Sequence, residues 1–332
     1  MPEPKAARGL QIASIALLGA ALAILTYGDV FGQNAVAGIA VLLAIPFALG
    51  AIASSAFDPY GEAPPHGCLY IPALVTGMLA LVGWLVFGEG AICLAMIVPL
   101  WLAIAVGGAL TNLFLRWRRK ASGNDDDHDD QSRLRTSALA LIPVVALTFD
   151  LTTSPHWQEH AVTRSIEIDA SADAIWPLLV SIPDISPSEG HWTMTQNLLG
   201  VPRPSEARLV REGSHLVRKA RWGENIRFEE RITTLEPARA IEWSFAFPDT
   251  SVQRHTDRHI APAGPMLRIQ SGRYDLEAIA PGRTRVTLTT RYISRVRLDG
   301  YFAWWGERML GDIESNVLAI VRTRTERRTA LP

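Results

Sequence analysis

Charged residues make up 20% of this 332-residue chain, and the formal net charge is -1 at pH 7. Only a handful of these charges lie between Leu10 and Leu115, whereas Arg, Glu and Asp are frequent after Arg116. The length and this split predict two domains, one apolar and one polar. No dominant basic face favours nucleic acid as a partner. The two cysteines, Cys68 and Cys93, exclude a disulfide framework and are interpreted as buried thiols.

The apolar half contains several segments that are long enough to cross a bilayer. The first could instead be a signal peptide, because Lys5 and Arg8 precede it, but further apolar segments follow and no convincing cleavage site does. We therefore expect an α-helical transmembrane bundle in residues 1–120. A shorter stretch, 137–153, ends in Asp150 and is predicted as a probable fifth span. The four main spans are expected at residues 10–27, 34–57, 70–87 and 91–115.

Basic residues near the span ends predict the orientation of the chain. Lys5 and Arg8 precede the first span, and a basic cluster at 116–120 follows the fourth, so both should face the cytoplasm. Residues 121–136 then form an acidic cytoplasmic linker. Because the fifth segment is predicted to cross the inner (plasma) membrane, we expect the C-terminal domain to be extracytoplasmic. If that segment only lies on the membrane surface, the domain is cytoplasmic. Acidic residues lie in turns and not in mid-span, which favours an anchor over a transporter.

Neither the acidic linker nor the histidines indicate a metal site. An EF-hand loop counted from Asp125 would need glycine at its sixth position and a carboxylate at its twelfth, but these positions are Asp130 and Thr136. The linker is therefore interpreted as a solvated acidic segment. His255 and His259 lie four residues apart, but no third ligand is assured there. We expect no metal and no cofactor, and no known catalytic motif is present.

After residue 160 the pattern changes to that of an α+β domain. Alternating residues predict a strand at 162–169, and Ser171 is a good N-cap for a short helix. A long amphipathic helix is expected at 301–327, with an apolar stripe formed by Phe302, Trp305, Met309, Ile313, Val317 and Ile320. Turn residues separate further strands, with a probable bulge at Ser271–Gly272. These strands are expected at 206–212, 214–222, 225–235, 240–247, 267–278 and 284–293.

Four segments carry a resemblance to a known family. They are VTRSIEIDASADAIWPLL (162–179), IRFEERITTLEPARAIEWSF (226–245), GRYDLEAIAPGRTRVTLTTRY (272–292) and YFAWWGERMLGDIESNVLAIV (301–321). Residues 160–328 resemble the START/polyketide-cyclase-like (SRPBCC) superfamily, here joined to membrane spans as in uncharacterised bacterial proteins. The resemblance implies a helix-grip fold, in which a curved antiparallel sheet surrounds a long C-terminal helix. It also implies a deep apolar cavity without naming the ligand, because members differ widely in function.

Strand alternation predicts which side chains line this cavity. If a three-residue turn joins the second and third of these strands, Arg218 and Glu230 share the inner face, and burial requires that they pair. An ion pair at the open rim of the sheet is the alternative. The other candidates are aromatic, and core packing would also explain most of them: Trp222, Phe228, Trp243, Phe245, Tyr274, Tyr292 and Trp305.

The sequence favours a non-catalytic, membrane-anchored domain that binds, senses or transfers a lipid or other apolar small molecule. One alternative is a cyclase- or hydrolase-type enzyme for a polyketide-like or aromatic substrate, with Glu230 or a tyrosine as acid or base. Another is a scaffold whose cavity is filled by its own side chains. The expected partners are the lipid bilayer and an apolar ligand, with a possible homo-oligomer formed through the spans.

Overall fold

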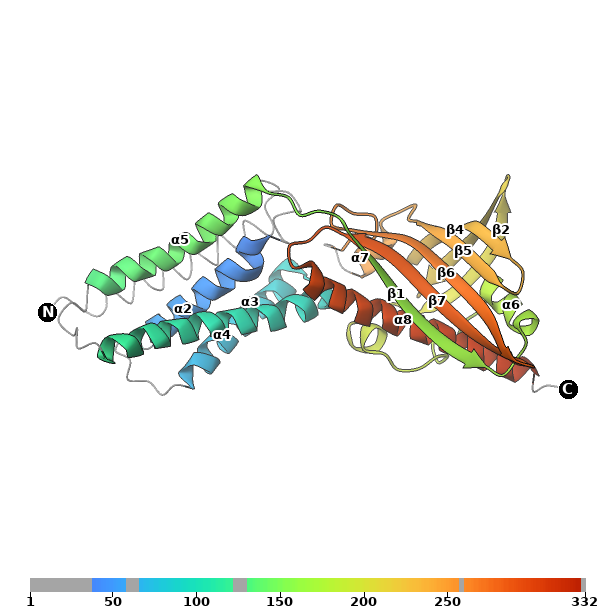
Figure 1. The fold of residues 1–332 in the computed structure, drawn as a ribbon, viewed down its shortest axis with the longest axis horizontal. Helices are drawn as coiled ribbons and strands as arrows, with labels where there is room; N and C mark the ends of the chain where they lie inside the picture. The colour runs from blue at the N-terminus through green and yellow to red at the C-terminus, as the bar shows by residue number, and fades with distance from the viewer. Residues whose placement is uncertain (1–37, 58–65, 122–129, 257–259, 330–332) are drawn as a thin grey trace. The chain divides into compact units, whose positions relative to one another are not determined.

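The computed structural model describes residues 38–57, 66–121, 130–256 and 260–329 (Figure 1). The chain divides into two compact units, which meet in the sequence between Pro155 and His156. The predicted first span, residues 10–27, and half of the predicted linker, residues 122–129, lie outside the described residues.

The described part of the N-terminal unit is helical. A π-helical turn, η2 (Ala40–Ala44), continues as α2 (Ile45–Phe57), and α3 (Gly67–Phe87), α4 (Ala91–Ala121) and α5 (Asp130–Thr152) follow. Helices therefore occupy the regions of the second to fifth predicted spans. The boundary of the linker is different, because α5 already begins at Asp130. Residues 131–142 contain neither glycine nor proline, so nothing interrupts the helix there.

Two described helical segments, Ala40–Phe57 and Ala91–Arg118, are long and apolar enough to cross a membrane, whereas Tyr70–Leu85 and Leu141–Thr152 are shorter. The Ala40–Phe57 segment is 72% buried, as the core helix of a soluble protein also would be. Ala91–Arg118 is only 22% buried, so most of its apolar surface faces outward. The multi-span bundle thus stays a prediction.

Small residues bring α2 and α4 into close contact. A Cβ atom at Gly50 would lie 1.9 Å from the carbonyl oxygen of Ala105, and one at Gly108 would lie 2.1 Å from that of Phe47. No larger residue fits at either position without moving a helix. Gly50 and Gly108 therefore allow the backbones of these two helices to approach closely.

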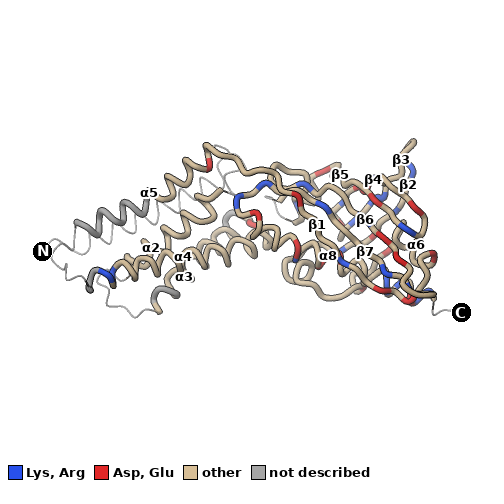
Figure 2. The backbone as a smooth tube through the Cα atoms, in the orientation of Figure 1, with Lys and Arg blue, Asp and Glu red and all other residues tan. Residues whose placement is uncertain are grey.

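The C-terminal unit is built on one seven-stranded antiparallel sheet in the order β1-β7-β6-β5-β4-β3-β2. All of the predicted strands are present, and the register of β6 against β7 shifts between Ile269 and Ser271, next to the predicted bulge. Figure 2 shows many charged residues along these strands and few along α2 and α3. The strands are β1 (Gln158–Ile168), β2 (Pro204–Glu212), β3 (His215–Trp222), β4 (Ile226–Glu236), β5 (Ala240–Ala246), β6 (Leu267–Ala280) and β7 (Arg283–Ser294).

Four further elements accompany the sheet: α6 (Ala172–Val180), η3 (Met194–Leu198), α7 (Ser251–His255) and α8 (Asp299–Thr329). As predicted, the Ser171 side chain caps α6 and accepts a hydrogen bond from the Ala174 amide at 3.4 Å. The long helix α8 packs chiefly on β1 and also contacts β7, α6 and η3 (Figure 1). This arrangement of sheet and terminal helix fits the expected helix-grip architecture.

The buried face of α8 differs from the predicted apolar stripe. Trp305 and Ile320 of that stripe are buried, but Met309, Ile313 and Val317 are only partly buried. Further buried positions repeat at spacings of three and four residues along a neighbouring stripe: Gly311, Glu314, Leu318, Val321 and Thr325. The helix is rotated toward the side where small residues allow β1 to approach, since a Cβ at Gly311 would lie 2.0 Å from the Arg164 guanidinium.

The main core lies between α6, α8 and the inner face of the sheet. It contains Ile168, Ile175, Leu178, Ile241, Val286, Leu318 and Val321, among others. A smaller cluster of Ala220, Ile226 and Phe228 lies on β3 and β4. The inner face of the sheet therefore carries two apolar clusters, and the helices α6 and α8 cover the first.

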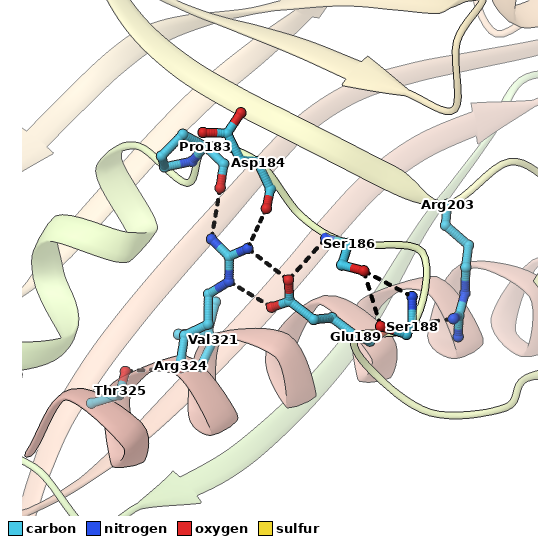
Figure 3. Close-up of polar contacts among 9 residues, drawn as sticks. All are labelled: Pro183, Asp184, Ser186, Ser188, Glu189, Arg203, Val321, Arg324 and Thr325. Atoms are coloured by element: carbon cyan, nitrogen blue, oxygen red, sulfur yellow. Dashed lines mark hydrogen bonds and ion pairs between the residues drawn. The ribbon is translucent and has the colours of Figure 1, made fainter. Parts of the chain in front are cut away.

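Arg324, near the end of α8, ties the segment after α6 to this helix (Figure 3). Its guanidinium pairs with both carboxylate oxygens of Glu189, at 2.6 and 2.7 Å, and donates to the carbonyl oxygens of Pro183 and Asp184. The hydrogen bond from Arg324 is the largest influence holding the pKa of Glu189 below its usual range. Both side chains are mostly buried, so this contact fixes one end of the unit.

Candidate functional site

Arg218 and Glu230 form a buried ion pair on the inner face of the sheet. The strands β3 and β4 pair Arg218 with Glu230 and Trp222 with Ile226. The turn therefore consists of residues 223–225, one residue later than predicted, and Arg218 and Glu230 share a face as expected. Arg218 is 4% exposed and Glu230 is 7% exposed. The Nε atom of Arg218 donates to Glu230, and a terminal nitrogen donates to the carbonyl oxygen of Leu179 at the end of α6. The pair therefore also fastens α6 to the sheet.

Two aromatic rings complete the surroundings of Arg218. Its guanidinium lies 4.6 Å from the ring centroid of Trp243 and 5.6 Å from that of Tyr274. Desolvation lowers the pKa of Arg218, but the Glu230 carboxylate more than offsets this and the pKa is raised. Burial also raises the pKa of Tyr274 to about 12. At neutral pH this group thus consists of one ion pair and a neutral phenol.

Aromatic side chains continue from this pair across β3, β4 and β5. Their ring centroids lie 5.5 Å apart for Trp222 and Phe228, 5.9 Å for Phe228 and Phe245, and 6.2 Å for Phe245 and Phe247. Phe228 is buried, but the other three are only partly buried. We call Trp222, Phe228, Phe245 and Phe247 the aromatic surface. It meets the main core where Phe245 contacts Trp243, at 6.0 Å between centroids.

The remaining two predicted residues, Tyr292 and Trp305, lie near the start of α8. Tyr292 stacks on His160 at 4.9 Å, and its hydroxyl occupies the space that a Cβ at Gly306 would need. Burial raises the pKa of Tyr292 to about 12. Trp305 is 9% exposed and packs against Trp304 at 5.1 Å. In the described contacts, Tyr292 and Trp305 therefore pack against residues of β1 and α8, and not against Arg218 and Glu230.

Sequence reasoning missed Glu314, which lies on the buried face of α8 and is 2% exposed. Within the part of the chain that the structure describes, neither carboxylate oxygen has a hydrogen-bond partner. Burial raises the pKa of Glu314 to about 8; Thr290 and Arg164 lie close enough to oppose this effect, but they do not cancel it. The signal in the sequence was the spacing of Glu314 from Gly311 and Leu318.

No family model matches this sequence, and no curated protein matches it. Solved structures do resemble about half of the chain. The Zhui aromatase/cyclase from Streptomyces sp. R1128 is 19% identical, with a TM-score of 0.33, over 52% of this chain and 98% of that one. A point mutant of Thalictrum flavum norcoclaurine synthase is 10% identical, with a TM-score of 0.33, over 53% and 99%. Ara h 8.0201 is 12% identical, with a TM-score of 0.31, over 51% and 99%.

At these identities the similarity concerns the fold alone, and it is partial. The neighbours include aromatase/cyclase structures. The fusion of this domain to a membrane region stays a prediction. Function is therefore argued from the residues of the site itself.

Proposed function

We propose that the C-terminal unit binds an apolar small molecule against the aromatic surface, and that the N-terminal helices anchor it in a membrane. The observation that carries the proposal is the partial exposure of Trp222, Phe245 and Phe247 on the inner face of the sheet. Large aromatic side chains that meet solvent on a concave surface mark binding sites more often than structural ones.

The surroundings of the aromatic surface support binding more than catalysis. Arg218 and Glu230 adjoin it through Trp243 and Phe245, but their charged groups already contact each other, Leu179 and two rings. An ion pair used in this way holds the wall of the site in place. The aromatic rings then supply the contact area for a ligand.

The anchoring part of the proposal is supported by α4. Its segment Ala91–Arg118 is long, apolar and mostly unburied. Leu110, Phe114 and Leu115 are among its exposed apolar side chains, and a basic cluster at residues 116–120 follows. An outward apolar surface that ends in basic residues is typical of a helix in a bilayer.

The test is equilibrium dialysis of the full chain, solubilised in detergent, with the tricyclic hydrocarbon fluorene, corrected by a detergent blank. We expect saturable binding that Phe245→Ala weakens about ten-fold, the loss of one well-packed aromatic contact. The matched control is Trp192→Ala, which removes an aromatic side chain that is 67% exposed and outside the aromatic surface, and which should leave binding unchanged. Absence of saturable binding, or equal effects of the two variants, would overturn the proposal.

A further inference from the structure

The carboxyl group of Glu314 is a second polar feature of the interior, separate from the Arg218–Glu230 pair. Its two oxygens have no hydrogen-bond partner among the described residues, although the side chain is 2% exposed. A buried polar group without a partner destabilises a protein by about 1–3 kcal/mol. Such a group is therefore expected to have a partner in the working state of the molecule.

The polar groups around Glu314 lie on the three strands β1, β6 and β7. Arg164 of β1 faces it, but this guanidinium is bound to the Glu307 carboxylate at 2.6 Å. Thr290 of β7 lies beside the carboxyl group, and Tyr274 of β6 is near enough to interact with it electrostatically. Burial outweighs the attraction of Arg164, so at neutral pH Glu314 is largely a neutral carboxylic acid.

A second unpartnered polar atom points to the same place. The Nε1 atom of Trp243 is buried and has no hydrogen-bond partner within the described ranges. The Trp243 ring lies over Gly272, where an added Cβ would be 2.2 Å from ring carbon Cζ2 and 2.7 Å from Nε1. Gly272 pairs with Thr290 in the ladder between β6 and β7. The indole N–H therefore lies over the strand position that pairs with Thr290, and Thr290 lies beside the Glu314 carboxyl group.

The chemistry of these groups defines what could join them. A neutral carboxylic acid has one donor and free acceptor positions, an indole N–H only donates, and a threonine hydroxyl does either. Two donors in the same region of an apolar interior match the two lone pairs of a single oxygen atom. We propose that Glu314, Trp243 and Thr290 bind a neutral oxygen function, a ketone or hydroxyl, of the apolar ligand. This inference rests on the proposed function and narrows its ligand to oxygenated molecules.

The test compares three probes of nearly equal shape, fluorene, 9-fluorenone and 9-fluorenol, by equilibrium dialysis with the detergent-solubilised full chain. We expect the two oxygenated probes to bind about ten-fold more tightly than fluorene, the effect of one buried hydrogen bond. Glu314→Leu should remove this preference without weakening the binding of fluorene. Glu314→Gln keeps a donor and an acceptor at the same position, and it should retain most of the preference.

The stability of the unliganded variants separates recognition from a structural role. If Glu314 serves the ligand, Glu314→Leu should leave the urea midpoint unchanged or raise it, because a buried group without a partner is removed. A clear fall in the midpoint would assign Glu314 to the fold and overturn the inference. Equal affinities of fluorene and 9-fluorenone in the wild type would also overturn it, and would indicate that only a buried water meets these groups. Failure of every probe to bind would instead refute the proposed function.

Discussion

The Arg218–Glu230 pair offers a sharp test of how this domain is held together. Replacing Arg218 by Met keeps an unbranched side chain and removes the charge. Glu230, which is 7% exposed, would then remain without its cationic partner, and the Leu179 carbonyl oxygen would lose a donor. Removing one member of a buried ion pair typically costs about 3–5 kcal/mol of the free energy of unfolding. We expect a loss of this size.

A double-mutant cycle isolates the contribution of the pair. Glu230→Leu alone should also destabilise the protein, whereas Arg218→Met combined with Glu230→Leu should recover most of the loss, since no unpaired charge remains. The assay is urea unfolding of the detergent-solubilised chain, followed by the circular-dichroism signal of the β-sheet. Lys219→Met is the matched control, because Lys219 is the next residue on β3 and its side chain and that of its partner Glu212 are about half exposed.

The outcome that refutes this reasoning is additivity. If each single variant loses less than about 1 kcal/mol, or if the double variant loses the sum of the two, the charges are solvated and do not depend on each other. The pair would then be an ion pair at the rim of the sheet, which the sequence left as the alternative.

Three further predictions concern other parts of the unit. Gly272→Ala should destabilise the protein by about 1–3 kcal/mol in urea unfolding, because its Cβ would overlap the ring of the buried Trp243. Arg324→Met should increase proteolysis of the segment after α6. In the wild type, Glu189 contributes stability above pH 4.5 that is lost as the pH falls through its lowered pKa, and this contribution should shrink in Arg324→Met because only the Ser186 amide and Arg327 then favour the carboxylate. The pKa of Glu314 is raised, so the free energy of unfolding of the wild type should fall by roughly 1 kcal/mol per pH unit as the pH rises from 4.5 to about 8. Glu314→Leu should remove this slope from urea unfolding measured as a function of pH. Unchanged slopes or an unchanged protease pattern would contradict these last two.

The strands could be predicted because local patterns determine them. Alternation and turn residues locate each strand, and one assumption about the turn near Gly223 was enough to place Arg218 and Glu230 on the same face. The same reasoning placed the aromatic residues of β5 on one face. Local pattern determines which face a side chain takes, since successive residues of a strand point to opposite sides.

The position of a residue relative to the long helix could not be predicted in this way. Tyr292 and Trp305 were grouped with Arg218, but the contacts of Tyr292 are with His160 and the helix near Gly306. The apolar stripe of α8 was chosen by hydrophobicity, so Glu314 was not among the predicted buried residues. Small residues such as Gly311 decide which side of a helix can approach a sheet, and hydrophobicity does not report this.

The order of the strands also has a consequence for synthesis and folding. The first strand, β1, pairs with the last, β7, and the Thr163 side chain contacts that of Thr289, which is 126 positions later in the sequence. The edge of β1 therefore has no native partner until nearly the whole domain has left the ribosome. Such long-range pairing slows folding and leaves an exposed strand open to incorrect association. The helices α2 to α5 precede the sheet in the sequence, so they can pack against one another before the last strand, β7, has been synthesised.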